Sequence, residues 1–261
     1  MGTVLGCNPG VEASRPELRD ELRDELGDEE PSELLVLLHG LGGTGDIWLP
    51  GIADRDDRWA GWWWAPDLPG HGATGQRLAG YTFRSMAEAL ATQLPPARRY
   101  VVVGHSLGGV VGLELAHLVP AVRTVVGVGI KVEWTDDELA RARDLARRPV
   151  AWFDTEAEAV ARHRKVSGIG DLVDDDIART GVVDEGRRWR LALDPLAFAV
   201  GRPEMARLVD GSPAEVVLAR GETDHMVTEA QLRALVPAPV ILPGLGHNAH
   251  LEDPGAVLRL A

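Results

Sequence analysis

Short apolar runs separated by glycine-rich turns recur along residues 34–132 and again from about residue 215 onward. A continuous run of about four to eight apolar residues is typical of a strand buried on both faces of a parallel sheet. Such runs predict strands at residues 34–38, 62–65, 100–103 and 124–130, and a further strand that delivers a carboxylate is expected at residues 218–224. Apolar residues recur at helical spacing over residues 83–94, and a helix is also expected at 107–116. Alternating strands and helices predict an α/β fold with a mostly parallel sheet flanked by helices.

The interval from residue 133 to residue 210 has no buried-strand pattern and is rich in Arg, Asp, Glu and Ala. Helices are predicted there at residues 136–147, 156–166 and 203–209. We therefore expect a helical insertion at 133–210 within an α/β core that comprises residues 34–132 and 211–261.

Residues 1–33 differ in composition from the rest of the chain. From Glu12 to Glu33 there are ten acidic and three basic residues, a net charge of −7 (3 minus 10). Leu18, Leu22 and Leu26 recur every four residues, which predicts a short helix with a thin apolar stripe. We interpret residues 1–33 as an acidic segment, helical or frayed at its ends, and a docking surface for a partner is the alternative.

A serine lies in a glycine-flanked turn between a predicted strand and a predicted helix. The sequence is Gly104-His105-Ser106-Leu107-Gly108, after the apolar run that ends at Val103. Flanking glycines permit a tight turn that exposes a serine side chain, and the helix N-terminus behind it favours developing negative charge. The motif therefore indicates a nucleophilic serine.

Three further loops carry the groups that such a serine requires. A serine hydroxyl needs a base that is active near neutral pH, a carboxylate to orient that base, and N–H donors for an oxyanion. The segment 218–224 ends in Asp224, the turn 243–247 ends in His247, and the segment 39–43 is a glycine-rich loop. Glu222 is the competing acid and His250 the competing base.

These motifs, in the order serine, acid, histidine, resemble those of the α/β-hydrolase family over residues 34–261. The resemblance implies that Ser106 is the nucleophile, His247 the general base and Asp224 the acid. It also implies an oxyanion hole formed by the backbone N–H groups of Leu41 and Leu107. Residues 133–210 occupy the place where the family inserts its helical lid, which shapes the substrate pocket.

The resemblance leaves three functions open. The first is cleavage of a small carboxylic ester, lactone or thioester through an acyl-enzyme intermediate. The second is hydrolysis of a carbon–carbon or amide bond by the same residues, and the third is a non-catalytic ligand-binding protein with the same fold. Serine at position 106 weighs against the family's dehalogenases and epoxide hydrolases, which use a carboxylate nucleophile.

Composition limits the partners that we expect. The net charge of −13 argues against nucleic-acid binding. Cys7 is the only cysteine, which favours a reducing, cytoplasmic setting, and no apolar run is long enough to span a membrane. No metal-ligand spacing or dinucleotide-binding glycine motif is present, so we expect neither metal nor cofactor. A small-molecule substrate is the expected partner, and a homo-oligomer is left open.

Overall fold

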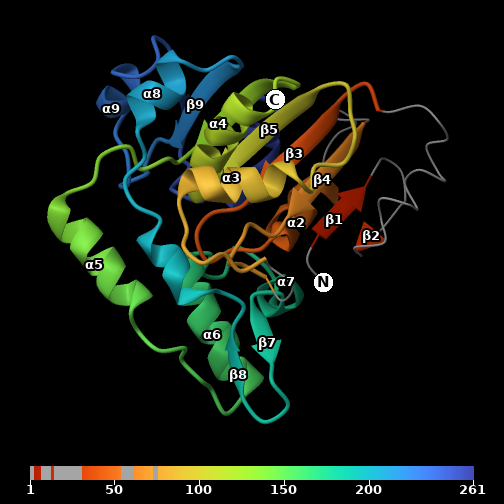
Figure 1. Cartoon of the computed structure of the whole chain (residues 1–261), viewed down its shortest axis with the longest axis vertical. Helices are drawn as coiled ribbons and strands as arrows, with labels where there is room; N and C mark the ends of the chain where they lie inside the picture. Colours follow the sequence, from red (N-terminus) through yellow and green to blue (C-terminus); the bar gives the residue numbers. More distant parts are fainter. Residues whose placement is uncertain (1–2, 7–12, 15–30, 54–60, 73–75) are drawn as a thin grey trace.

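The computed structural model describes residues 3–6, 13–14, 31–53, 61–72 and 76–261 (Figure 1). Its main sheet has eight strands in the order β10-β9-β6-β5-β3-β4-β1-β2. The strands from β10 to β4 are parallel, whereas β1 and β2 join the edge in antiparallel fashion. The bounds are β1 Thr3–Gly6, β2 Ala13–Ser14, β3 Leu34–Leu38, β4 Trp62–Pro66, β5 Tyr100–His105, β6 Val122–Val128, β9 Glu215–Gly221 and β10 Val240–Leu242. The expected α/β fold with a mostly parallel sheet is confirmed.

Five predicted strands are confirmed as β3, β4, β5, β6 and β9. The short strands β1, β2 and β10 were not predicted, because two to four residues give too little pattern to recognise. Strands β1 and β2 both fall within residues 1–33, so these described parts of the segment form strand rather than the expected helix. The helix predicted around Leu18, Leu22 and Leu26 lies outside the described residues.

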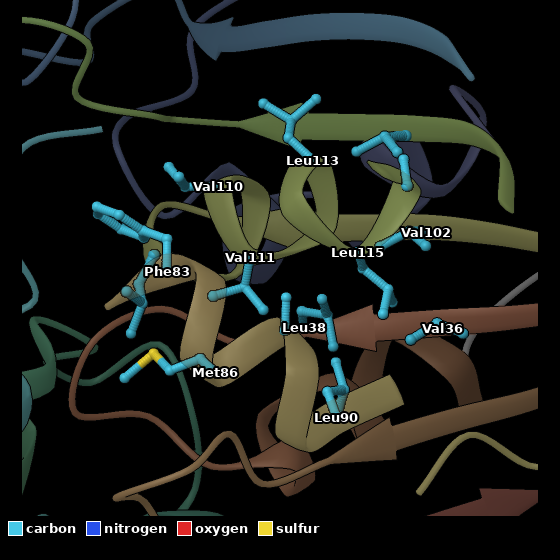
Figure 2. Close-up of a cluster of buried hydrophobic side chains, with 14 of the residues drawn as sticks. Val36, Leu38, Phe83, Met86, Leu90, Val102, Val110, Val111, Leu113 and Leu115 are labelled. Carbon is cyan, nitrogen blue, oxygen red and sulfur yellow. The ribbon is translucent and has the colours of Figure 1, made fainter. Parts of the chain in front are cut away.

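Two apolar cores cover the two faces of the sheet. Successive residues of a strand point to opposite faces, so Val36 and Leu38 pack into one core and Leu35 and Leu37 into the other. Figure 2 shows the first core, where helices α3 (Phe83–Ala91) and α4 (Leu107–Leu118) lie against β3 and β5. The tryptophans of β4 divide in the same way, with Trp63 in the second core and Trp64 in the first. Burial on both faces explains why these strands are continuously apolar.

Helices of the core connect the strands. Helix α3 begins after Thr82, whose side chain accepts a hydrogen bond from the Ser85 N–H, while the Ser85 hydroxyl accepts one from the Thr82 N–H. Helix α3 spans Phe83–Ala91. The other helical elements of the core are η1 Gly45–Trp48, α2 Leu49–Ala53, α4 Leu107–Leu118, α9 Glu229–Arg233, α10 Ala249–Glu252 and α11 Pro254–Leu258.

The insertion at residues 133–210 is a mixed structure. It contains α5 Asp136–Ala146, α6 Glu156–Ser167, α7 Asp175–Arg179, β7 Val182–Asp184, β8 Trp189–Leu191, η2 Pro195–Ala199 and α8 Met205–Asp210. The three predicted helices are confirmed as α5, α6 and α8. The expectation of an entirely helical insertion is wrong, because β7 and β8 form an antiparallel pair. Each of these strands has three residues, which is too short for a recognisable alternation. In Figure 1, α6, α7, β7 and β8 gather at one end of the molecule.

The buried carboxyl group of Asp67, beside the sheet, is expected to make the stability of the fold depend on pH. Asp67 follows β4; its Oδ1 accepts a hydrogen bond from the Gly45 N–H at 2.9 Å, and its Oδ2 is buried with no partner among the described residues. Burial raises the pKa of Asp67 to about 7, and the neighbouring Asp46 carboxylate adds to the effect. The folded protein therefore binds a proton that the unfolded chain releases near pH 4, so stability falls as the pH rises from about 4 to about 7.

Replacement of Asp67 by Asn removes this proton and retains an acceptor for the Gly45 N–H. Between pH 5 and pH 8, the parent is expected to lose about 2–3 kcal/mol of unfolding free energy relative to Asp67→Asn. Urea unfolding of both proteins at the two pH values measures the difference. Equal pH dependence in the two proteins would contradict the burial of an ionisable Asp67.

Candidate active site

Ser106 occupies a strained turn between β5 and α4. Its φ is 49° and its ψ is −113°, and it is the only non-glycine residue with positive φ among the described residues. A side-chain-bearing residue pays a conformational cost at positive φ, and such strain concentrates at functional sites. Ser106 is also the residue directly before the first turn of α4, whose N–H groups create positive potential. The local structure therefore presents a hydroxyl where negative charge is favoured.

The glycines around Ser106 are required by close backbone approach. A Cβ atom at Gly104 would lie 2.5 Å from the backbone of Gly108 and Gly109. A Cβ atom at Gly108 would lie 2.4 Å from the carbonyl oxygen of Leu38 at the end of β3. Any side chain at either position would force α4 away from the sheet, so the two glycines allow the helix to start directly beside the strand ends.

His247 and Asp224 form a hydrogen-bonded pair. Nδ1 of His247 lies 3.2 Å from Oδ1 and 3.1 Å from Oδ2 of Asp224. The Asp224 side chain is fully buried, whereas that of His247 is 21% exposed. Because a carboxylate accepts, Nδ1–H of His247 is the donor, which leaves Nε2 as the free basic nitrogen.

The loop around Asp224 is held by Arg220 and by its own backbone. Arg220, a buried residue of β9, donates from Nη2 to the Asp224 carbonyl at 2.6 Å and from Nε to the Val227 carbonyl at 2.8 Å. The Met226 N–H donates to Oδ1 of Asp224 at 2.7 Å. Burial acts to raise the pKa of Asp224, but the hydrogen bonds from His247 and Met226 outweigh it, so the pKa of this carboxyl is lowered. Asp224 is therefore ionised near neutral pH.

The end of β6 joins the serine turn to the histidine–aspartate pair. The Ser106 N–H donates to the Val128 carbonyl at 2.8 Å. A Cβ atom on the next residue, Gly129, would lie 3.2 Å from Nδ1 of His247 and 3.3 Å from Oδ2 of Asp224. His105, next to Ser106, bonds through Nε2 to the His247 carbonyl at 3.0 Å. The three predicted residues Ser106, His247 and Asp224 are thus gathered at one end of β5, β6 and β9.

The peptide that carries the Leu41 N–H is held by its carbonyl. His39 lies under this loop: its Nε2 accepts from the Leu68 N–H at 2.9 Å, so its Nδ1–H donates to the Gly40 carbonyl at 2.8 Å. The Gly43 N–H donates to the same carbonyl at 3.0 Å. In a trans peptide the N–H points opposite to the C=O, so these two bonds aim the Leu41 N–H away from His39.

The backbone N–H groups of Leu41 and Leu107 are the two expected oxyanion donors. Neither the Leu41 N–H nor the Leu107 N–H bonds to another backbone carbonyl in the described part of the chain. A Cβ atom at Gly40 would lie 3.5 Å from Cβ of Ser106, so the loop that carries Leu41 lies beside the serine. Leu107 follows Ser106 directly, which brings both N–H groups to the same region.

The competing residues have other contacts. Glu222 accepts the Gly244 N–H at 2.8 Å, so it supports the loop before His247 rather than the imidazole. His250 is buried and stacks on His105 with ring centroids 4.0 Å apart. Neither ring nitrogen of His250 has a hydrogen-bond partner among the described residues. The only acid–imidazole hydrogen bond here is therefore that of Asp224 with His247, within the described residues.

Sequence reasoning missed the residues that hold the loops in place. Arg220 is one, and the bond of His105 to the His247 carbonyl is another. An arginine directly after the apolar residues 216–219, four residues before Asp224, is a signal for the first. The second has no sequence signal, because its acceptor is a backbone carbonyl 142 residues away.

Comparison with known proteins decides the family. Residues 35–260 match the model of the alpha/beta hydrolase family. The chain belongs to the alpha/beta hydrolase family. Its solved structural neighbours share the hydrolase fold: E-2-(acetamidomethylene)succinate hydrolase matches with a TM-score of 0.71 and 22% identity over 89% of this chain and 91% of that one. The Mycobacterium tuberculosis esterase Rv0045c matches with a TM-score of 0.66 and 24% identity over 90% of this chain and 84% of that one.

Two curated relatives are similar to this chain over only part of their own length. One is the dihydrolipoyllysine-residue acetyltransferase component of the acetoin cleaving system of Cupriavidus necator, 28% identical over 85% of this chain and 60% of that protein. The other is "Putative carbamate hydrolase RutD" of Escherichia coli, 41% identical over 36% of this chain and 35% of that protein. The chain therefore spans between about a third and three fifths of these relatives.

The described residues include neither a helix that could span a membrane nor a cluster of metal ligands. None of their helices is both long and apolar enough to cross a membrane. Within the same residues, no group of three or more His, Cys, Asp or Glu side chains is placed to hold a metal ion.

Proposed function

We propose that this hydrolase cleaves a small carboxylic ester, lactone or thioester through an acyl-enzyme intermediate. Ser106 is the nucleophile, His247 the general base and Asp224 the acid that orients it. The backbone N–H groups of Leu41 and Leu107 form the oxyanion hole. The observation that carries the proposal is the positive φ of Ser106 at the N-terminus of α4, beside a hydrogen-bonded histidine–aspartate pair.

Each chemical step has a residue to perform it. Nε2 of His247 accepts the Ser106 proton as the serine oxygen attacks the substrate carbonyl, and the two N–H groups bind the oxyanion. The imidazolium then donates that proton to the leaving alcohol or thiol, which departs and leaves an acyl-serine. Water attacks the acyl group, His247 takes the water proton, and the proton passes to Ser106 as the acid product leaves. Asp224 stabilises the imidazolium in both halves of the reaction.

The insertion at 133–210 is proposed to act as the lid of this site. The carbonyl of Gly168, which ends α6, accepts a hydrogen bond at 2.8 Å from Nδ2 of Asn248, the residue after His247. A Cβ atom at Gly42 would lie 3.3 Å from Cα of Ser167 in the same helix. The end of α6 therefore contacts loops on two sides of the proposed site, where it can exclude water and limit substrate size.

A hydrolysis panel tests the proposal. It comprises p-nitrophenyl esters of graded acyl length, lactones, a thioester, amides, carbamates and a vinylogous diketone, each with the parent protein. Ester, lactone or thioester turnover is expected to exceed the others. A protein that turns over none of them and resists a fluorophosphonate probe would support the third alternative, a non-catalytic binding protein.

One observation favours a second candidate, hydrolysis of an amide-type bond. The 96 residues that match RutD are 41% identical to a protein whose name describes a carbamate hydrolase. The same serine, base and oxyanion donors serve both reactions, and protonation of a nitrogen leaving group becomes the more demanding step. Faster turnover of carbamates or amides than of matched esters in the panel would select this candidate.

The acid assignment predicts a large, specific loss. Replacement of Asp224 by Asn preserves shape but presents an amide N–H₂ to the imidazole, which favours the wrong tautomer of His247. The expected loss in kcat is about 10⁴-fold on p-nitrophenyl acetate. Glu222→Gln is the matched control, and it is expected to stay within about tenfold because Glu222 bonds a backbone N–H. If Glu222→Gln instead shows the large loss in kcat and Asp224→Asn stays close to the parent, the acid is Glu222.

A further inference from the structure

We infer that His163, in the insertion, is a positioning residue for the proposed oxyanion hole. The inference rests on the proposed function, since it concerns the loop that carries Leu41. Residues 40–43, called the glycine turn below, are closed by the Gly43 N–H donating to the Gly40 carbonyl at 3.0 Å. His163 lies on α6 and reaches the opposite side of this turn.

The contact is a single hydrogen bond of defined direction. Nε2 of His163 lies 3.0 Å from the Gly42 carbonyl, and a carbonyl can only accept, so Nε2–H is the donor. The His163 side chain is buried, and burial lowers its pKa, so the ring is neutral near pH 7. A neutral imidazole with its proton on Nε2 can donate this hydrogen bond near pH 7 without any change in its protonation state.

This bond completes the fixation of one peptide group. The peptide between Gly42 and Gly43 has its N–H bound to the Gly40 carbonyl and its C=O bound to His163. The first of these bonds also holds the Gly40 carbonyl, which sets the direction of the Leu41 N–H. Loss of the His163 bond leaves the Gly42–Gly43 peptide held only through its N–H, which loosens one of the two bonds on the Gly40 carbonyl. The bond from His39 then remains as the only firm constraint on the direction of the Leu41 N–H. The function of His163 is therefore preorganisation of an oxyanion donor.

The His163 ring is closely packed, which restricts the orientation of its hydrogen bond to the Gly42 carbonyl. A Cβ atom at Gly181 would lie 2.1 Å from the His163 ring, so the loop after α7 packs directly on the imidazole. Beside it, the hydroxyls of Thr44 and Thr180 are bonded at 2.7 Å. This second bond also fastens the insertion to the segment after the glycine turn, but it does not touch the Gly42 peptide, which makes Thr180 a matched control.

The test compares two side chains of equal length. Gln at position 163 can donate from its amide to the Gly42 carbonyl, whereas Met fills a similar volume and cannot donate. On p-nitrophenyl acetate, His163→Met is expected to lower kcat about 10- to 100-fold with KM within about threefold, because the oxyanion hole acts on the transition state. His163→Gln is expected to recover kcat to within about fivefold of the parent.

Controls separate positioning from stability. Thr180→Val removes the hydroxyl that bonds Thr44 and the Ile177 carbonyl, neither of which touches the Gly42 peptide, and is expected to keep kcat within about twofold. The shape of the pH profile is expected to be the same in all variants, because His247 and Asp224 are intact. Equal losses in His163→Met and His163→Gln, a loss confined to KM, or an equal loss in Thr180→Val would overturn the inference.

NMR of the parent protein tests the inference even if His163→Met does not fold. The ¹⁵N resonances of the His163 ring, assigned by their absence in His163→Gln, are expected to show an Nε2–H tautomer. Phosphonylation of Ser106 places an oxygen against the Leu41 N–H and is expected to shift the Nε2 resonance through the shared turn. An unchanged resonance would overturn the inference. If instead the parent neither turns over substrate nor reacts with the phosphonate, the proposed function fails and the positioning role falls with it.

Discussion

Replacement of Ser106 by Ala is expected to lower kcat about 10⁶-fold on p-nitrophenyl acetate. The serine oxygen is the atom that forms the proposed acyl-enzyme, and neither His247 nor the oxyanion donors can replace it. The residual rate is expected to come from the oxyanion hole and substrate binding alone. Stopped-flow and steady-state hydrolysis, with a fluorophosphonate probe as an independent label of the nucleophile, measure the loss.

The fold is expected to survive this change. The hydrogen bonds of Ser106 to neighbouring residues are made by its backbone: its N–H donates to Val128, and its carbonyl accepts from Gly109 and Val110. Alanine retains them and has the same restriction at positive φ as serine. Circular dichroism and thermal unfolding close to those of the parent are the control. Ester turnover within tenfold of the parent in purified Ser106→Ala would place the nucleophile elsewhere.

The sequence predicted the central strands because their environment leaves a strong pattern. Strands β3 and β5 are buried throughout and β6 is buried from Val125 to Val128, so nearly every residue in these stretches is apolar. Strand β10 and the pair β7–β8 have three residues each and are partly exposed, and neither feature imposes a readable pattern. The apolar pattern therefore predicts strands that are buried over several consecutive residues. It does not predict short strands that are defined only by their hydrogen-bonded pairing.

The same distinction applies to the site. The candidate residues Ser106, Asp224 and His247 could be named because each follows a predicted strand or lies in a turn that contains glycines, and because their order along the chain resembles that of the family. Arg220 and His163 could not, because they act on backbone carbonyls, which every residue has. Side chains proposed to perform chemistry can be recognised by residue type and motif, whereas side chains that hold loops are visible only in three dimensions.

Replacement of His247 by Asn is expected to lower kcat about 10⁵- to 10⁶-fold on the same ester. The amide N–H₂ of Asn can still donate to Asp224, so the buried carboxylate keeps a partner, but no group remains to accept the Ser106 proton. The loss is therefore expected to exceed that of Asp224→Asn, where the base is misoriented but present. Single-turnover kinetics with an activated ester, together with thermal unfolding, measure both effects.

His250→Phe is the matched control for the base, because it tests the only other histidine within three residues of His247. The His250 ring stacks on His105 and lies 4.9 Å from the Trp48 ring, and its nitrogens have no hydrogen-bond partner among the described residues. A phenyl ring preserves the stacking and leaves no buried donor unpaired. Activity within about tenfold of the parent is therefore expected, with at most a modest change in stability. The opposite ranking, an active His247→Asn beside an inactive but folded His250→Phe, would transfer the general base to His250 and would require Asp224 to hold a histidine that takes no part in proton transfer.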